Sequence, residues 1–251
     1  SPYSISDDER KKFIENKTAE LVNLIKFFVE NSKSKLIVTN FVPPIYSPYG
    51  IFESKTNYGF QEMIYDLNHK LLVEFKNNPL VYVFDFNGFV TSFGQNNVFD
   101  YRQYYLGDVK VSLEKIPYLA NALMSYVKPI LGLNKKCIVL DLDNTLWGGI
   151  IGEDGFNGIK LGHNDPIGKS FIEFQKYLLS LHERGIILAV NSKNNFDDAI
   201  KVIKEHPNMI LHEEHFASLK INWNDKATNL QEIAQEVNIG LDSMVFFDDD
   251  K

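Results

Sequence analysis

The chain has 251 residues, of which 44% are hydrophobic, and 26 basic against 33 acidic side chains give it a net charge of −7. This acidic balance argues against a nucleic-acid partner. If the protein acts on an anionic phosphate, we expect a metal ion to bridge its carboxylates and the phosphate. The single cysteine, Cys137, excludes an internal disulfide. No apolar run is long enough to cross a membrane, so the composition predicts a soluble, cytoplasmic protein.

The first half of the chain alternates between helix and strand patterns. Residues 6–31 open with a capping-box motif, Ser6-Asp7-Asp8-Glu9, and continue with apolar residues at helical spacing. The next predicted elements are strands over 35–39 and 80–86, helices over 57–77 and 112–127, and loops over 40–50 and 99–108. Alternation of this kind predicts a parallel sheet between helical layers.

The second half alternates in the same way after a short polar linker, residues 132–136. The predicted elements are strands over 137–140, 186–190, 209–211 and 243–247, and helices over 167–184, 196–205 and 225–238. The chain starts without methionine and stops directly after an apolar strand, so we expect truncation at both ends. The sequence therefore predicts an α/β protein of two domains, residues 1–131 and 132–251, each an open, mainly parallel sheet flanked by helices.

Two carboxylates directly follow the first strand of the second half. Cys137–Leu140 is apolar, and Asp141 and Asp143 come next, spaced by one residue. In extended backbone these side chains point to one side, about 7 Å apart, and their repulsion is relieved by a cation or a shared proton. A divalent ion leaves one carboxylate oxygen able to attack an electrophile. Gly148-Gly149 then permits a tight reversal, which we expect to keep backbone N–H groups near the acids for phosphate oxygens.

Two later strands also end in polar residues. Ser192 follows the second strand, and Asp248 and Asp249 follow the last one. Because the carboxyl ends of parallel strands open onto one crevice, we expect these groups to meet Asp141 and Asp143. The alternatives are structural: adjacent acids also serve as turn residues, and a serine before a helix also serves as a cap.

The motif at 141–145, Asp-Leu-Asp-Asn-Thr, resembles the first motif of the haloacid dehalogenase (HAD) superfamily, Asp-x-Asp-x-Thr. Its extension through Leu-Trp-Gly-Gly-Ile-Ile-Gly-Glu-Asp-Gly to residue 155 resembles the FkbH-like branch, and residues 222–229 match that pattern and contain Lys226. The resemblance implies a HAD-like Rossmann-type domain over 132–251. In element order, residues 1–131 resemble the later part of an SGNH hydrolase domain. No catalytic serine or Asp-x-x-His is recognisable there, which favours a structural or substrate-positioning role.

The resemblance implies a role for each site residue. Asp141 is the nucleophile that forms an aspartyl-phosphate, and Asp143 protonates the leaving group and then deprotonates the water. Ser192 hydrogen-bonds a phosphoryl oxygen, and Lys226 balances the charge. Mg²⁺ is bound by Asp141, the backbone carbonyl of Asp143 and Asp249, with Asp248 as a second candidate. The residues implied to contact the substrate are Asn144, Thr145, Gly148, Asn191 and Lys193.

Three hypotheses about function follow. The first is a Mg²⁺-dependent phosphatase or phosphotransferase acting on a small phosphorylated metabolite. The second is glyceryl transfer from a glycerate acyl phosphate to an acyl carrier protein, as in FkbH-like proteins. That chemistry needs a cysteine, often in Cys-Ser-Lys-Asn, where this chain reads Asn191-Ser192-Lys193-Asn194, and an amide forms no thioester. The third is a binding or scaffolding module with vestigial acids. The usual Asp-Asp-Asn also differs here, as Asp248-Asp249-Asp250.

Overall fold

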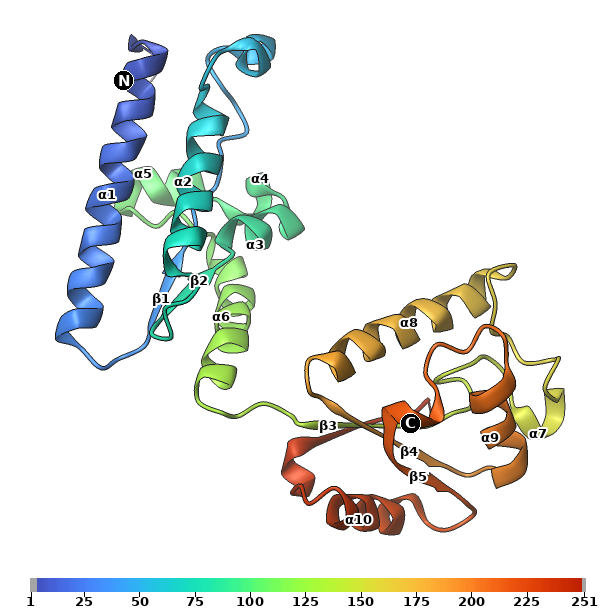
Figure 1. The fold of residues 1–251 in the computed structure, drawn as a ribbon. Coiled ribbons are helices and arrows are strands. Elements are labelled where there is room, and N and C mark those ends of the chain that lie inside the picture. The colour runs from blue at the N-terminus through green and yellow to red at the C-terminus, as the bar shows by residue number, and fades with distance from the viewer. Residues whose placement is uncertain (1–3, 250–251) are drawn as a thin grey trace. The chain divides into compact units, whose positions relative to one another are not determined.

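A computed structural model describes residues 4–249 of the chain. It divides into two compact units, with the boundary between Gly132 and Leu133 (Figure 1). The strands of both units pair in parallel and are flanked by helices, which confirms the predicted α/β class. Asp250, part of the predicted acidic run at the last strand, lies outside the described residues.

The first unit is built on a small sheet in which β1 (Leu36–Thr39) pairs with β2 (Val81–Phe84). Its helices are α1 (Asp7–Asn31), α2 (Phe60–Phe75), α3 (Phe86–Phe93), α4 (Gln95–Val98), α5 (Tyr101–Gly107) and α6 (Ile116–Ile130), and its 3₁₀ segments are η2 (Gly50–Lys55) and η3 (Leu113–Lys115). The predicted capping box is present at the start of α1, because the Ser6 hydroxyl accepts from the Glu9 N–H and the Glu9 carboxylate accepts from the Ser6 N–H.

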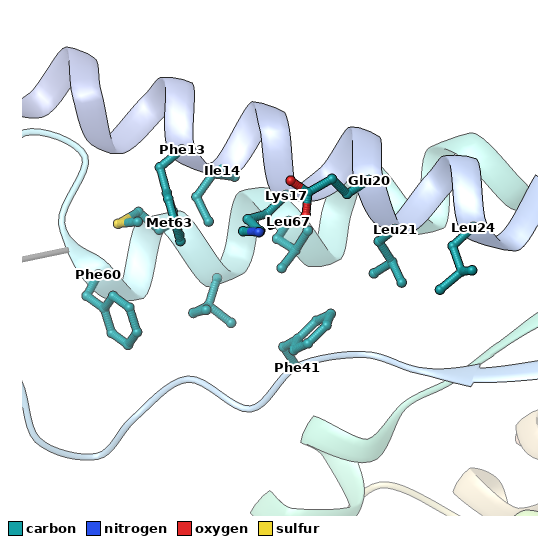
Figure 2. Close-up of a pocket in the computed structure, with 11 residues that line it drawn as sticks. Phe13, Ile14, Lys17, Glu20, Leu21, Leu24, Phe41, Phe60, Met63 and Leu67 are labelled. Atoms are coloured by element: carbon teal, nitrogen blue, oxygen red, sulfur yellow. Dashed lines mark hydrogen bonds and ion pairs between the residues drawn. The ribbon is translucent and has the colours of Figure 1, made fainter. Parts of the chain in front are cut away.

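An apolar groove lies between α1 and α2, with a volume of about 560 Å³ (Figure 2). Its walls come from both helices and from Phe41, in the segment after β1. Lys17 and Glu20 are the charged side chains that line it. A groove of this composition offers apolar surface and no cluster of groups suited to phosphate chemistry.

The second unit contains a four-stranded parallel sheet in the order β5-β4-β3-β6. Its strands are β3 (Cys137–Leu140), β4 (Ile187–Ser192), β5 (Phe216–Ile221) and β6 (Met244–Phe247). Its helices are α7 (Ile151–Asp154), α8 (Pro166–Glu183), α9 (Phe196–Glu205) and α10 (Lys226–Glu236), and its 3₁₀ segments are η4 (Glu213–His215) and η5 (Leu241–Ser243). Strand β3 lies between β4 and β6, so the carboxyl ends of these three strands are neighbours.

Helices cover both faces of this sheet. Buried residues of α8 and α9 pack with Leu140, Leu188 and Val190 in one cluster, whereas Ile233 of α10 packs with Val139 in another. Figure 1 shows α10 on the opposite side of the sheet from α8. The strands are therefore held between two apolar layers, which fixes where their ends lie.

Two predicted elements are wrong. Residues 99–108 are not a loop, because Asp100 caps α5 through its Oδ1, which accepts from the N–H groups of Arg102 and Gln103, both at 3.0 Å. Residues 209–211 are not a strand. The N–H groups of Ile210 and Leu211 donate to Gln175 Oε1 of α8, at 2.8 and 3.1 Å, instead of to a neighbouring strand. The strand beside β4 is β5, which the sequence analysis did not predict.

Two predicted boundaries also move. The second strand ends at Phe84 instead of continuing to residue 86, because Asp85 Oδ1 accepts from the Gly88 N–H at 2.9 Å and starts α3. The helix predicted over 112–127 continues as α6 to Ile130, with Pro129 in its last turn. No helix among residues 4–249 is both long and apolar enough to span a membrane.

Candidate active site

Three acidic side chains converge at the carboxyl edge of the second sheet. Leu140 of β3 pairs with Phe247 of β6, so Asp141 and Asp248 continue from adjacent strands. One carboxylate oxygen from each of Asp141, Asp248 and Asp249 lies within 4.8 Å of the others. These residues are far apart in the sequence, and the parallel pairing of β3 with β6 brings them together.

Asp141 is 7% exposed, and its two oxygens have separate partners. Oδ1 accepts from the Leu142 N–H at 2.7 Å, and Oδ2 accepts from Lys226 Nζ at 2.8 Å. Burial raises the pKa of Asp141 above its usual value, and hydrogen bonds from Lys226, Ser192 and Leu142 offset part of that rise. The local hydrogen bonds thus favour the carboxylate form that a nucleophile or a metal ligand requires.

Lys226 bridges two of the acids. It is the first residue of α10, and its Nζ donates to Asp141 Oδ2 at 2.8 Å and to Asp248 Oδ2 at 2.7 Å. Burial alone would lower the pKa of Lys226, but the hydrogen bonds to the two acids outweigh it and the pKa is raised. The side chain is therefore an ammonium at neutral pH and neutralises part of the acidic cluster.

The donor set fits Mg²⁺. The three carboxylates exceed the single ammonium by two negative charges, and every candidate ligand atom is a carboxylate oxygen. Mg²⁺ prefers oxygen ligands and retains water in part of its coordination shell, and Asp249 is exposed to solvent. The residues that would bind the ion are Asp141, Asp248 and Asp249, whose mutual repulsion it would relieve.

The Asp143 side chain lies outside this cluster and is held by the turn that follows it. Its Oδ1 accepts from Trp147 Nε1 at 2.8 Å and from the Ile151 N–H at 3.1 Å. Trp147 is fully buried, so its indole fixes the carboxyl group from the protein interior. No described residue donates to Oδ2, which leaves one oxygen for a proton-transfer role.

The two glycines of this turn donate their own N–H groups to other parts of the protein. The Gly148 N–H donates to the Lys160 carbonyl at 3.1 Å, and the Gly149 N–H donates to Asn144 Oδ1 at 2.8 Å. The protein itself occupies both donors, so the N–H of Gly148 is not available to a substrate. The prediction that other backbone N–H groups near the acids bind phosphate oxygens stays a prediction. Glycine is required at 148 by packing, since a Cβ there would lie 2.9 Å from Phe171. Asn144 adopts a left-handed conformation (φ 53°), so it shapes the turn.

The remaining predicted residues divide into two groups. Ser192 is 1% exposed and hydrogen-bonds Asp141, and Asn194 Nδ2 donates to its hydroxyl at 3.1 Å. Thr145 is half-buried and Lys193 is exposed beside the strand ends. Asn191, in contrast, is fully buried and donates to the Lys226 carbonyl at 2.9 Å, so it faces the protein interior and not a substrate.

The sequence analysis did not single out Trp147 or Asn229, although both bear on the site. Asn229 is fully buried, and its Nδ2 donates to Asn191 Oδ1 at 3.1 Å. The signal for both was their place within the motifs at 141–155 and 222–229. Asn229 contacts Asn191, 38 positions away, and the bond from Trp147 to Asp143, four positions away, depends on how the turn folds. Spacing alone therefore did not reveal their roles.

Comparisons with known proteins identify a matching family model and a similar solved structure. Residues 2–128 match the family model described as FkbH, N-terminal domain. The chain is also similar to a crystal structure of the N-terminal part of the protein BF1531 from Bacteroides fragilis, containing phosphatase domain and complexed with Mg, at 32% identity and a TM-score of 0.88. The match covers 99% of this chain but 65% of that one. No match was found among curated proteins. The SGNH-like resemblance stays a prediction.

Proposed function

Because the chain belongs to the FkbH family, whose model matches residues 2–128, we propose that its second unit is a Mg²⁺-dependent phosphatase or phosphotransferase of the HAD type. One observation carries this proposal: Asp141, Asp248 and Asp249 converge beside Lys226 at the carboxyl edge of a parallel sheet. The similarity to a phosphatase-domain structure complexed with Mg supports it. The proposed substrate is a small phosphorylated metabolite.

In the proposed reaction, an Asp141 oxygen attacks phosphorus in line with the leaving oxygen. The new bond gives an aspartyl-phosphate as the bond to the leaving group breaks, and Asp143 gives the leaving oxygen a proton. Asp143 then takes a proton from the water that hydrolyses the aspartyl-phosphate. Lys226 and Ser192 contact Asp141 already, so they are placed to hold phosphoryl oxygens. Bound Mg²⁺ would supply further positive charge against the phosphoryl group.

Glyceryl transfer to an acyl carrier protein remains the second candidate, and it requires a thiol. Cys137 is fully buried in β3, and burial raises its pKa to about 11, so it is a poor nucleophile at neutral pH. Asn191 takes the position where FkbH-like sequences often read cysteine. The described residues therefore support phosphoryl transfer better than thioester formation.

The test is phosphate release from a panel of small phosphomonoesters and acyl phosphates, with Mg²⁺ and with EDTA. We expect Mg²⁺-dependent release, lost on chelation and restored by added Mg²⁺. Asp141→Asn removes the nucleophile and should lower the rate roughly 10³-fold or more. Asp198→Asn, an exposed acid in the first turn of α9, is the matched control and should behave as wild type. No Mg²⁺-dependent release by the wild type would reject the proposal in favour of a scaffolding module. Full release by Asp141→Asn would reject Asp141 as the nucleophile.

A second experiment separates the two enzymatic candidates. The chain is incubated with a glycerate acyl phosphate and an acyl carrier protein, and the carrier is weighed by mass spectrometry. Hydrolysis releases phosphate and leaves the carrier unchanged. An acylated carrier would instead establish transfer and identify the carrier as a partner.

A further inference from the structure

A network of buried amide side chains lies behind Lys226. Asn191, at the end of β4, and Asn229, in α10, are both fully buried. Asn191 Nδ2 donates to the Lys226 carbonyl at 2.9 Å, and Asn229 Nδ2 donates to Asn191 Oδ1 at 3.1 Å and to Asn222 Oδ1 at 3.0 Å. The network therefore joins β4, the segment after β5 and the first turns of α10.

These hydrogen bonds act on the backbone from which the Lys226 side chain extends. The Asp225 carboxylate caps α10 by accepting from two N–H groups of its first turn. Asn191 holds the same turn from the sheet side, because its Nδ2 donates to the carbonyl of Lys226, the first residue of α10. Buried amides are costly unless their hydrogen bonds are satisfied, and satisfied networks specify one arrangement.

Lys226 needs this support for a geometric reason. Its side chain is long and flexible, yet its Nζ lies 2.8 Å from Asp141 and 2.7 Å from Asp248. A shift of the helix start would move the ammonium away from one acid or both. Errors of about 1 Å in the placement of such groups can cost roughly 100-fold in rate.

We infer that Asn191 and Asn229 are positioning residues that fix Lys226 between Asp141 and Asp248. For catalysis, this inference rests on the proposed function. Among the described residues, neither amide hydrogen-bonds Asp141, Asp248 or Asp249, and both are fully buried. They act through Lys226, so their removal should weaken transition-state stabilisation more than substrate binding.

The experiment compares Asn191→Leu, Asn229→Leu and the double variant, with Asn195→Ala as control. Asn195 is an exposed amide that caps α9 and does not contact Lys226. We expect each leucine variant to lower kcat about tenfold, with KM near the wild-type value. The double variant should be no slower than the slower single variant, because both amides act through one lysine. If Asn191→Leu does not fold, Asn191→Ser removes the amide with less disturbance.

Hydrogen exchange of the amides over residues 222–230 is read in parallel and needs no activity. Exchange should be faster in the leucine variants and unchanged in Asn195→Ala. Wild-type kcat or unchanged exchange in both leucine variants would overturn the positioning role. A wild-type chain without Asp141-dependent phosphate release would instead refute the proposed function, and the exchange data would still decide whether the network holds the start of α10.

Discussion

The strand ends of the two units differ in what their polar side chains contact. In the first unit, Asn40 follows β1 and Asp85 follows β2, and Asn40 Nδ2 donates to Asp85 Oδ1 at 2.7 Å. The same oxygen caps α3. In the second unit, the strand-end groups of β3 and β6 are like charges held together, with only Lys226 as the cation among the described residues within reach. Strand-end groups that satisfy one another stabilise the fold, whereas clustered carboxylates require a cation.

The two units also differ in how much apolar side chain they bury. The second sheet is covered on both faces by well-packed helices. In the first unit, α6 contains no fully buried residue, and Leu24 and Phe27 of α1 are each 65% exposed. The comparison indicates that a repulsive cluster of acids persists where a large core fixes the strands that carry it.

Truncating a buried leucine of the second unit and an exposed leucine of the first unit should give the largest contrast. Leu188→Ala in β4, which is fully buried, should lower the free energy of unfolding by about 2–5 kcal/mol because it leaves a cavity. Leu24→Ala should cost under about 0.5 kcal/mol. Urea unfolding followed by far-UV circular dichroism measures both, and fluorescence of Trp147 and Trp223 reports the second unit alone. Equal losses would contradict the difference in burial.

The second test measures how well the second unit shields the thiol of Cys137 from a reagent in solution. Burial raises the pKa of Cys137 to about 11, so its thiolate forms only as the pH rises toward that value. At pH 8 we expect native Cys137 to react with a thiol reagent at least about 100-fold more slowly than the urea-unfolded chain. The rate should increase with pH throughout the range below 11. Rapid native modification would show that the sheet of the second unit opens readily.

The two tryptophans allow a smaller and more local test. Trp147→Phe keeps an aromatic ring but removes the N–H that donates to Asp143 Oδ1. We expect kcat for phosphate release to fall roughly tenfold, because the acid loses part of its orientation. Trp223, which is 75% exposed, gives the matched variant Trp223→Phe, expected to leave kcat unchanged. Similar kcat values for the two variants would show that the Trp147 N–H is not needed to orient Asp143.

The helix cap of the first unit should give the smallest effect. Ser6→Ala removes the acceptor for the Glu9 N–H and should cost about 1 kcal/mol of stability in α1. Ser6→Asp keeps a capping oxygen and should restore most of it. Thermal unfolding by circular dichroism measures the loss, and phosphate release should stay at the wild-type rate. A change in that rate would mean that the two units are energetically coupled.

The sequence by itself determined the elements whose signals are local. Apolar runs that stop at polar residues located β3, β4 and β6, and a capping box and helical periodicity located α1. The same local signal identified the acids after β3 and β6. Local patterns predicted a strand at residues 209–211, because the segment is short and apolar as a buried strand is. Only its hydrogen bonds to Gln175 show that it does not pair with a strand.

Tertiary structure decided what each site residue contacts. The pairing of β3 with β6 brings Asp141 close to Asp248 and Asp249. The Gly148 N–H donates to the Lys160 carbonyl and is therefore not available to a phosphate oxygen. The tertiary structure also directed Asn191 into a buried network under Lys226. The physical reason is that a hydrogen bond depends on distance and direction between groups remote in sequence, which the pairing of strands and the packing of helices set together.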